Sequence, residues 1–492
     1  MKKLSRRIYT AALYLAAFST HADQFGFQYW PYADTTVVYS KCLYDANWTN
    51  LNAQVESDLD HIASLGGNYI RFHWKTWSSL INNTSSTNHI RTELSEQTNN
   101  VVELLQLLDE RNLKIIIALE NDLLNNDAWQ TGWPNDQSGF FADCLTVYNA
   151  IISACENSSY ADTVLFYDLE NEVQPPDYDF AIYAYDYANA PAAKRGFSIG
   201  QAITKSQQFH DTLTTNRPLA YADFHSYTDN PQSNVTASVP VVRAAFSNAT
   251  VIMGEFGANL DLCYDDEPLQ MLENADRIDA ALQTQLAWYS IWSYVDRNGA
   301  NPFGALATPD DPRDTMGLIS DLFGLARNPD FESATAGLPD NWSCWQSGGD
   351  PMVFWRINDV TKSACGSGYA RIALPAGSVS AKIQISSDKF DIPAGAERLY
   401  LNSFIQANQW IDYAQMTVKQ FNSSGQQVAW NGSPQFNSPG WGWKNFLHNV
   451  GSWSVPLHAD CAKAQVIIKG QATPTTSDQA TLEIDAVSAS AR

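Results

Sequence analysis

Eight short apolar runs, spread over residues 24–325, limit what this chain can fold into more than any other feature. They cover residues 25–30, 68–74, 114–120, 164–172, 196–202, 219–225, 251–255 and 289–294. Stretches with helical spacing separate them, among them 51–64, 97–111, 142–155, 205–214 and 269–286. The alternative to a barrel is an open doubly wound sheet, but no glycine-rich phosphate loop follows the first run. Buried strands that alternate with helices over about 250 residues are typical of the (β/α)8 TIM barrel. We therefore predict an α/β fold of this kind.

The pattern changes after residue 325. Alternating apolar and polar residues occupy 369–374, 381–385, 399–405, 414–421, 465–469 and 481–487, with turn-forming residues such as 422–425 between them. Such runs are typical of an antiparallel, all-β jelly-roll sandwich. We therefore expect an amino-terminal segment over residues 1–22, a barrel over 23–327 and a β-sandwich over 328–492.

The amino-terminal segment has the pattern of a secretory signal peptide. Four basic residues, Lys2, Lys3, Arg6 and Arg7, precede an apolar run over 8–18 and small residues near Ala22. No later stretch approaches the roughly 18 apolar residues of a membrane span. Seven cysteines, without a CxxC pair, fit an oxidising compartment. We expect a secreted or periplasmic protein, with Cys344 and Cys365 as the first candidates for a disulfide.

Composition narrows the class of partner. The chain has 30 basic and 53 acidic residues, a formal net charge of -23, and such a surface repels nucleic acids and anionic membranes. Aromatic residues make up 12% of the chain, including 16 tryptophans, while only 17% of residues are charged. Sugar rings stack on indoles, so this balance favours a carbohydrate ligand, although ordinary core packing would account for about half of the tryptophans. We expect no nucleic acid and no membrane among the partners.

Two carboxylates lie at the ends of apolar runs that are predicted to form barrel strands. Glu172 ends the run 164–172, and Glu255 ends the run 251–255. The active site of such a barrel lies at the carboxyl ends of its strands. A single carboxylate there would be read as a solvated or capping group. Two at matching places are what glycoside hydrolysis requires, one to protonate the leaving oxygen and one to stabilise or attack the anomeric carbon.

Several motifs resemble those of known glycoside hydrolases. Asn171-Glu172 and Glu255 look like the catalytic positions of clan A, and the fuller pattern is similar to glycoside hydrolase family 5. Residues 65–71 are similar to that family's second-strand motif ending in arginine, residues 225–227 to its His-x-Tyr, and Trp292 to its sugar platform. The resemblance covers residues 24–325. One departure is Val173, where the family commonly has proline.

The resemblance implies a role for each matching residue. Glu172 would be the general acid and base, and Glu255 an ionised nucleophile about 5–5.5 Å away, as in retaining enzymes. The substrate-binding residues would be Arg71, Asn171, His225, Tyr227 and Trp292, with Trp30 at the end of the first run as a further subsite candidate. Strand alternation also leads us to expect Asp168 and Glu170 on the same face as Glu172. No metal motif occurs, and we expect no cofactor for catalysis.

The second domain resembles carbohydrate-binding modules of families 4 and 9. Residues 328–332 and 338–342 are similar to their opening strand, and 482–487 to their closing strand. The resemblance implies a structural calcium ion with Glu332 and Asp485 as candidate ligands; otherwise these are two solvated acids. Trp410, Trp441 and Trp443 stand in polar, turn-rich surroundings and are the candidates for stacking on sugar.

Together these observations predict a secreted, retaining β-glycoside hydrolase that cleaves a β-linked polysaccharide as an endo-β-glucanase or β-mannanase. An exo-β-glycosidase or transglycosylase of the same clan, and a noncatalytic glycan-binding protein, are the alternatives. The expected partner is a polysaccharide or oligosaccharide. Because one chain can contain the whole mechanism, we expect a monomer.

Overall fold

The computed structural model describes residues 24–492, apart from 32–38, 76–79, 82–88, 121–127, 174–176, 201–207, 209, 213–216, 228–230, 260–266, 295–303, 309–310, 326–330, 332, 336–337, 348–350, 359–362, 365–367, 438 and 441. The predicted signal peptide lies outside these described residues. The chain forms two compact units. One comprises residues up to 52, 67–265 and 272–304, and the other 53–66, 266–271 and 305–492.

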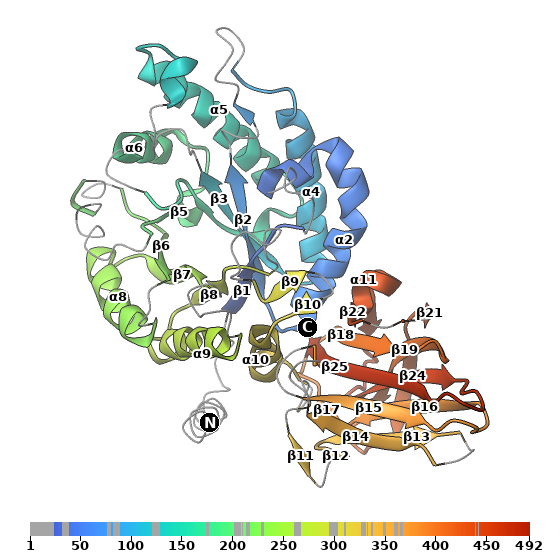
Figure 1. The fold of residues 1–492 in the computed structure, drawn as a ribbon. Helices are drawn as coiled ribbons and strands as arrows, with labels where there is room; N and C mark the ends of the chain where they lie inside the picture. Colours follow the sequence, from blue (N-terminus) through green and yellow to red (C-terminus); the bar gives the residue numbers. More distant parts are fainter. Residues whose placement is uncertain are drawn as a thin grey trace. The chain divides into compact units, whose positions relative to one another are not determined.

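The first unit contains a closed barrel of eight parallel strands in sequence order (Figure 1). The strands are β1 (Gln24–Gln28), β2 (Tyr69–Lys75), β3 (Lys114–Glu120), β4 (Val164–Asp168), β5 (Arg195–Ser198), β6 (Tyr221–Ser226), β7 (Thr250–Phe256) and β8 (Trp288–Ile291). The helices between them include α2 (Asp45–Ser64), α4 (Leu94–Asp109), α5 (Gln137–Glu156), α6 (Tyr178–Tyr187), α8 (Pro231–Ala245) and α9 (Glu267–Gln283). Each of the eight apolar runs therefore contributes a strand, and the predicted barrel is confirmed.

Apolar side chains fill one level of the barrel, below the polar residues at the strand ends. Tyr69, Ile116, Phe166 and Ile252 form a buried cluster. The rings of Phe166 and Tyr221 stack with centroids 4.5 Å apart. Because side chains alternate along a strand, β2 directs Tyr69 and, two and four residues later, Arg71 and His73 to the same side.

The helix α5 is long and apolar enough, by length and composition, to cross a membrane. In this structure apolar side chains of α5 pack in the protein interior, where Leu145, Ile151 and Ile152 are buried.

Two antiparallel sheets form the β-sandwich, as predicted. One has the order β13-β16-β24-β19-β20 with β17 and β21 beside it, and the other β14-β15-β25-β18-β22 with β23 beside it. The strands of the first sheet are β13 (Trp342–Gln346), β16 (Ala381–Ser387), β17 (Phe390–Asp391), β19 (Ile411–Phe421), β20 (Gln427–Gly432), β21 (Phe436–Asn437) and β24 (Lys463–Ala472). Those of the second are β14 (Val353–Asn358), β15 (Gly368–Leu374), β18 (Arg398–Ala407), β22 (Lys444–Asn445), β23 (Ser454–Pro456) and β25 (Ala480–Ala491).

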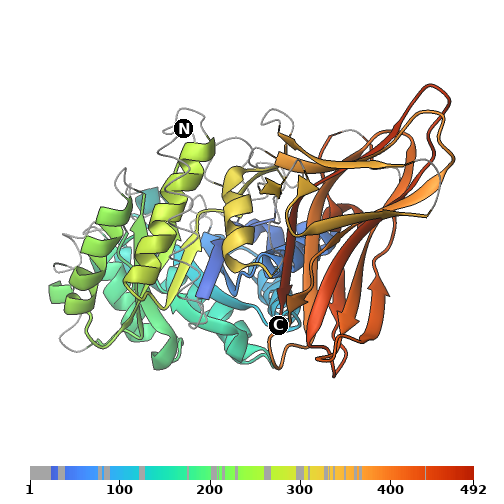
Figure 2. The same cartoon turned by 90° about the horizontal axis from the view of Figure 1, so that it is seen from below.

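An apolar core lies between these two sheets, which face each other in Figure 2. Ile385 and Met416 contribute to it from the first sheet, and Ile372 and Ile484 from the second. The remaining strands and α-helices of the described chain are β9 (Leu306–Thr308), β10 (Asp311–Pro312), α10 (Asp314–Phe323), β11 (Ala334–Thr335), β12 (Leu338–Pro339) and α11 (Phe446–Val450).

Candidate active site

Glu255 lies near the end of β7, buried and surrounded by donors. Arg71 Nη1 donates to its Oε1 over 2.5 Å, and the Tyr227 hydroxyl donates to its Oε2 over 2.6 Å. His73 Nε2 lies 2.9 Å from Oε1, and His225 Nδ1 lies 3.2 Å from Oε2. Burial by itself would raise the pKa of Glu255, but the charges of His225 and Arg71 and the contact with His73 hold that pKa well below its usual range. The carboxylate is therefore ionised at any ordinary pH.

Arg71 is the centre of the buried network. Its Nη2 donates to Asp168 Oδ2 over 2.7 Å and to Asn171 Oδ1 over 2.8 Å, while its Nε lies 3.5 Å from Asp223 Oδ2. Burial opposes its charge, yet Glu255, Asp223 and Asp168 together raise the pKa of Arg71 above its ordinary value. A planar guanidinium is suited to this task because its donors point in several fixed directions.

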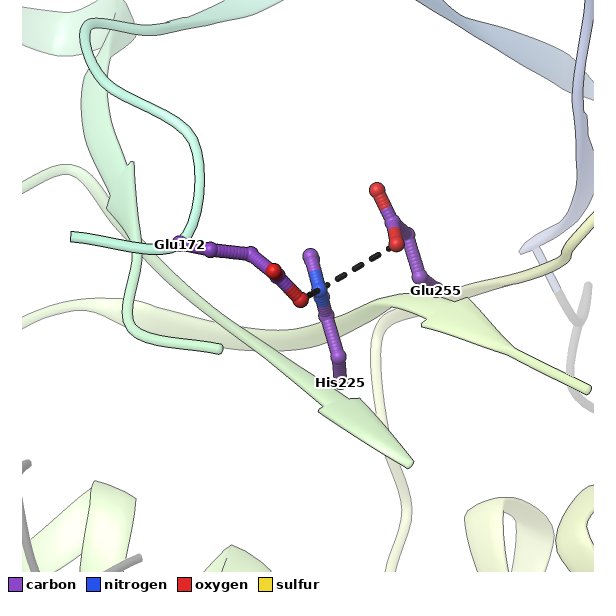
Figure 3. Close-up of side chains that lie close together, drawn as sticks. All are labelled: Glu172, His225 and Glu255. Atoms are coloured by element: carbon purple, nitrogen blue, oxygen red, sulfur yellow. Dashed lines mark hydrogen bonds and ion pairs between the residues drawn. The ribbon is translucent and has the colours of Figure 1, made fainter. Parts of the chain in front are cut away.

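Glu172 and Glu255 face each other across the imidazole of His225, as Figure 3 shows. His225 Nδ1 lies 2.7 Å from Glu172 Oε1, and one ligand atom from each of the three residues lies within 4.8 Å of the others. The Glu172 side chain is 41% exposed and that of Glu255 only 4%. One carboxylate is thus open to solvent, whereas the other is shielded and bonded on both oxygens.

His225 acts as a cation between these groups. Its Nε2 lies 2.9 Å from Ser198 Oγ and 3.7 Å from Asp223 Oδ2. Burial would lower the pKa of His225, but Glu255, Asp223 and Glu172 outweigh it and raise the pKa to about 10. The three residues Glu172, His225 and Glu255 have the spacing of metal ligands. While His225 carries its proton, its Nδ1 lies between the two carboxylates, 2.7 Å from Glu172 Oε1 and 3.2 Å from Glu255 Oε2.

Two buried aspartates support the site from below. Asp223 on β6 accepts a hydrogen bond from the backbone N–H of Gly254 over 2.5 Å, and Asp168 at the end of β4 accepts one from Ser198 over 2.8 Å. A side chain at position 254 would overlap the Asp223 carboxylate, which explains the glycine next to Glu255. Burial raises the pKa of Asp168 to about 7; Arg71 opposes this shift and Asp223 adds to it.

The expected alignment of Asp168, Glu170 and Glu172 on one face is wrong. The strand β4 ends at Asp168, four residues before the end of the predicted run. Glu170 then turns toward α5, where the Tyr148 hydroxyl donates to its Oε2 over 3.1 Å. Glu172 has a φ of 51°, in the left-handed region, so strand alternation does not apply to it.

His73 was not among the predicted site residues, although it contacts both Glu255 and Glu120. Its Nδ1 lies 3.0 Å from Glu120 Oε2, and Lys75 Nζ lies 3.2 Å from Glu120 Oε1. The signal was present: His73 is two residues after Arg71 in a strand, and alternation places both on the same side.

Two indoles adjoin the site. Trp292, half-buried after β8, has its ring centroid 5.4 Å from that of His73 and 5.4 Å from that of Trp30. Trp30 is buried, in edge contact with Trp292. Of the predicted substrate-binding residues, the structure thus brings Arg71, Asn171, His225, Tyr227 and Trp292 around the carboxylates, and places Trp30 behind Trp292.

The residues predicted for sugar stacking, calcium binding and a disulfide in the sandwich are only partly described by the structure. Trp410 packs partly buried against the core, and Trp443 is half-buried in edge contact with Tyr369. Trp441, Glu332 and Cys365 lie outside the described residues, while Cys344 is a free, exposed cysteine. Asp485 is buried, and its two oxygens accept hydrogen bonds from the backbone N–H groups of Ala364 and Ala486. The calcium ion stays a prediction, whereas the expected disulfide of Cys344 is not formed in this structure.

No family model matches this chain, and no curated protein matches its sequence. Among solved structures, an exo-β-1,4-mannosidase from Opitutaceae bacterium strain TAV5 is similar with a TM-score of 0.41 at 15% identity, over 58% of this chain and 56% of that one. A family 5 protein of subfamily 18 from Streptomyces cattleya, in complex with Manβ1-4GlcNAc, has a TM-score of 0.43 at 18% identity, over 58% and 76%.

A carbohydrate-binding module of the β-sandwich superfamily has a TM-score of 0.24 at 13% identity, over 33% of this chain and 60% of that one. The chain thus spans about 60% of the first two solved structures that it matches. These likenesses are weak.

Proposed function

We propose that this protein is a retaining β-glycoside hydrolase. The observation that carries the proposal is the pair Glu172 and Glu255, with carboxylate oxygens no more than 4.8 Å apart, one exposed and one buried and ionised. In retaining enzymes the carboxyl groups lie about 5–5.5 Å apart, whereas inverting enzymes need about 6.5–9.5 Å to admit water between them.

The proposed reaction has two displacements. In the first, Glu255 attacks the anomeric carbon, the glycosidic C–O bond breaks, and Glu172 gives its proton to the departing oxygen. In the second, Glu172 takes a proton from water, the water oxygen attacks the same carbon, and the bond to Glu255 breaks. The net reaction adds one water molecule across the glycosidic bond.

The surrounding residues have supporting roles in this scheme. Arg71 and Tyr227 hold Glu255 ionised and aimed. Because Asn171 accepts from Arg71 through Oδ1, its amide N–H groups are turned away and can donate to a sugar hydroxyl. Trp292 would provide an apolar wall for a sugar ring.

The proposed substrate is a β-linked polysaccharide, cleaved internally as by an endo-β-glucanase or β-mannanase. The tryptophan content and the second, sandwich-shaped domain favour a polymer, since a binding module raises the local concentration of catalyst on it. We also propose that the protein is secreted or periplasmic, from the pattern of residues 1–22, and that it acts as a monomer without a catalytic cofactor. Exo action on chain ends is the second candidate.

The test is hydrolysis of a panel of glucan, mannan, xylan and agar-type polymers, with viscosity and reducing ends followed together. We expect a fall in viscosity before much reducing sugar appears, and products with retained anomeric configuration by NMR. Glu255→Gln and Glu172→Gln should each lower kcat/KM at least about a thousandfold. Glu170→Gln is the matched control, since that carboxylate faces Tyr148 and should matter little for chemistry.

The proposal fails if wild type and Glu255→Gln share the same negligible activity on the whole panel. Persisting glycan binding in both proteins would then indicate a noncatalytic binding protein. Inverted products would contradict the double displacement alone.

A further inference from the structure

Two tryptophans of the sandwich expose most of their surface, and they were not among the predicted ones. Trp345 on β13 is 51% exposed, and Trp430 on β20 is 61% exposed. These strands lie at opposite ends of the order β13-β16-β24-β19-β20. At about 4.8 Å per strand, four steps separate the two strands by roughly 19 Å across the sheet. A ligand touching both indoles must therefore be long.

Strand register places both indoles on the same face of this sheet. Trp345 is opposite Gln384, Gln384 is opposite Lys469, and Lys469 is opposite Gln415. Residues directly opposite each other share a face. Lys469 Nζ also lies 5.1 Å from the centroid of the Trp430 ring, so Trp430 belongs to this face. We call it the Trp345–Trp430 face.

This face is basic although the protein is acidic. The whole chain has 30 basic and 53 acidic residues, but the five strands β13, β16, β24, β19 and β20 contain four lysines and one aspartate. Alternation along the strands puts Lys382, Lys419 and Lys469 on the Trp345–Trp430 face. Lys419 is directly opposite Trp430.

These three ammonium groups form no ion pair with the described residues. Lys463, also on β24, forms an ion pair with Asp391 over 2.7 Å, but no such pair is formed by Lys382, Lys419 or Lys469 in the described part of the chain. Burial and the charge of Lys382 both lower the pKa of Lys469, which is the effect of like charges placed close together. The face therefore has positive charge that a ligand could balance.

We propose that the Trp345–Trp430 face binds an extended anionic polysaccharide, whose rings stack on the two indoles and whose carboxylate or sulfate groups contact Lys382, Lys419 and Lys469. Gln384 and Gln415 lie between the indoles and can meet sugar hydroxyls. A nucleic acid would satisfy the lysines as well, but duplex DNA carries one negative charge per about 1.7 Å of its axis, and the net charge of -23 opposes a polymer more strongly the denser its charge. The net charge by itself would favour a neutral ligand, whereas the local distribution of lysines favours an acidic one.

The experiment is affinity electrophoresis of the full chain carrying Glu255→Gln, so that binding is measured without hydrolysis. The gels contain polygalacturonate, a sulfated carrageenan, hydroxyethyl cellulose or double-stranded DNA, at low and high salt. The test variants add Lys382→Gln with Lys469→Gln, or Trp345→Ala with Trp430→Ala. Lys463→Gln, which removes a lysine already paired to Asp391, is the matched control. Circular dichroism melting confirms that each variant is folded.

We expect retardation by polygalacturonate or carrageenan that weakens at high salt, and the stronger of the two identifies carboxylate or sulfate as the preferred group. The double lysine variant should bind about three- to tenfold more weakly, the double tryptophan variant should lose retardation, and the control should match the parent. Retardation by hydroxyethyl cellulose that equals that by the anionic polymers and is lost in the double tryptophan variant would overturn the proposal. Equal retardation by DNA, or binding of the anionic polymers unchanged in both double variants, would overturn it as well. Because each criterion depends on the sandwich variants and not on hydrolysis, the result is independent of the proposed catalytic function.

Discussion

Replacing His225 by glutamine tests how the charge of the buried Glu255 carboxylate is balanced. The change removes a cation whose pKa is raised to about 10, because Glu255, Asp223 and Glu172 outweigh its burial. His225 Nδ1 lies 3.2 Å from Glu255 Oε2, and opposite charges at that distance attract each other by about 5 kcal/mol at an effective dielectric constant near 20, or about 1.3 kcal/mol in water. Because Arg71 and Tyr227 still bind the carboxylate in the variant, we expect a loss in the lower part of this range, about 1.5–3 kcal/mol.

That energy corresponds to about one to two pH units, since one unit equals about 1.4 kcal/mol. Burial raises the pKa of Glu255, and the charge of His225 is the first of the influences that hold it down. We therefore expect the acid limb of the kcat/KM profile, which requires ionised Glu255, to move upward by about one to two units in His225→Gln. The assay is the pH dependence of hydrolysis on the best polymer or on an activated aryl glycoside. Glu170→Gln is the control, because that carboxylate accepts from Tyr148. An acid limb that stays in place or moves down in His225→Gln would refute this reasoning.

Three further predictions concern stability. Arg71→Lys keeps the charge but cannot bond Glu255 and Asp168 together, so the free energy of unfolding in denaturant should fall by about 3 kcal/mol; a loss below about 1 kcal/mol would contradict it. Gly254→Ala should lower the free energy of unfolding by about 2 kcal/mol and should also lower kcat/KM, because the added methyl group would displace the Asp223 carboxylate. Wild-type values of both quantities would contradict this prediction. Because the pKa of His225 rises from 6.5 to about 10 on folding, its stabilisation is complete below pH 6.5 and is lost as pH rises through 10. The melting temperature should thus fall more between pH 7 and 10 in wild type than in His225→Gln, and parallel curves would exclude that role.

The outline of the site could be read from local patterns. Buried strands need continuous apolar runs, and a strand followed by a carboxylate at the barrel rim is visible in one dimension, which is why Glu172 and Glu255 could be predicted together. The same holds for Arg71, because it falls inside an apolar strand where a charge requires buried partners.

The partners themselves depended on contacts between distant segments. Asp223 and Asp168 meet Arg71 only because strand register and closure bring β2, β4 and β6 to one level of the barrel. Glu170 shows the opposite case: its spacing from Glu172 suggested a shared face, but the strand had already ended. A pattern of period two is reliable only while the backbone stays extended.

In the sandwich, composition showed an excess of tryptophan but could not tell which of these tryptophans are exposed. An indole in the core and an indole on a ligand face have the same local neighbours in sequence, and only cross-strand pairing separates Trp345 and Trp430 from the others. Sequence alone therefore determined the two architectures and the acids at the barrel rim, because hydrophobic periodicity is a local property. Tertiary structure decided which charges neutralise each other and which indoles face solvent, because electrostatic and stacking energies depend on distances between groups far apart in the chain.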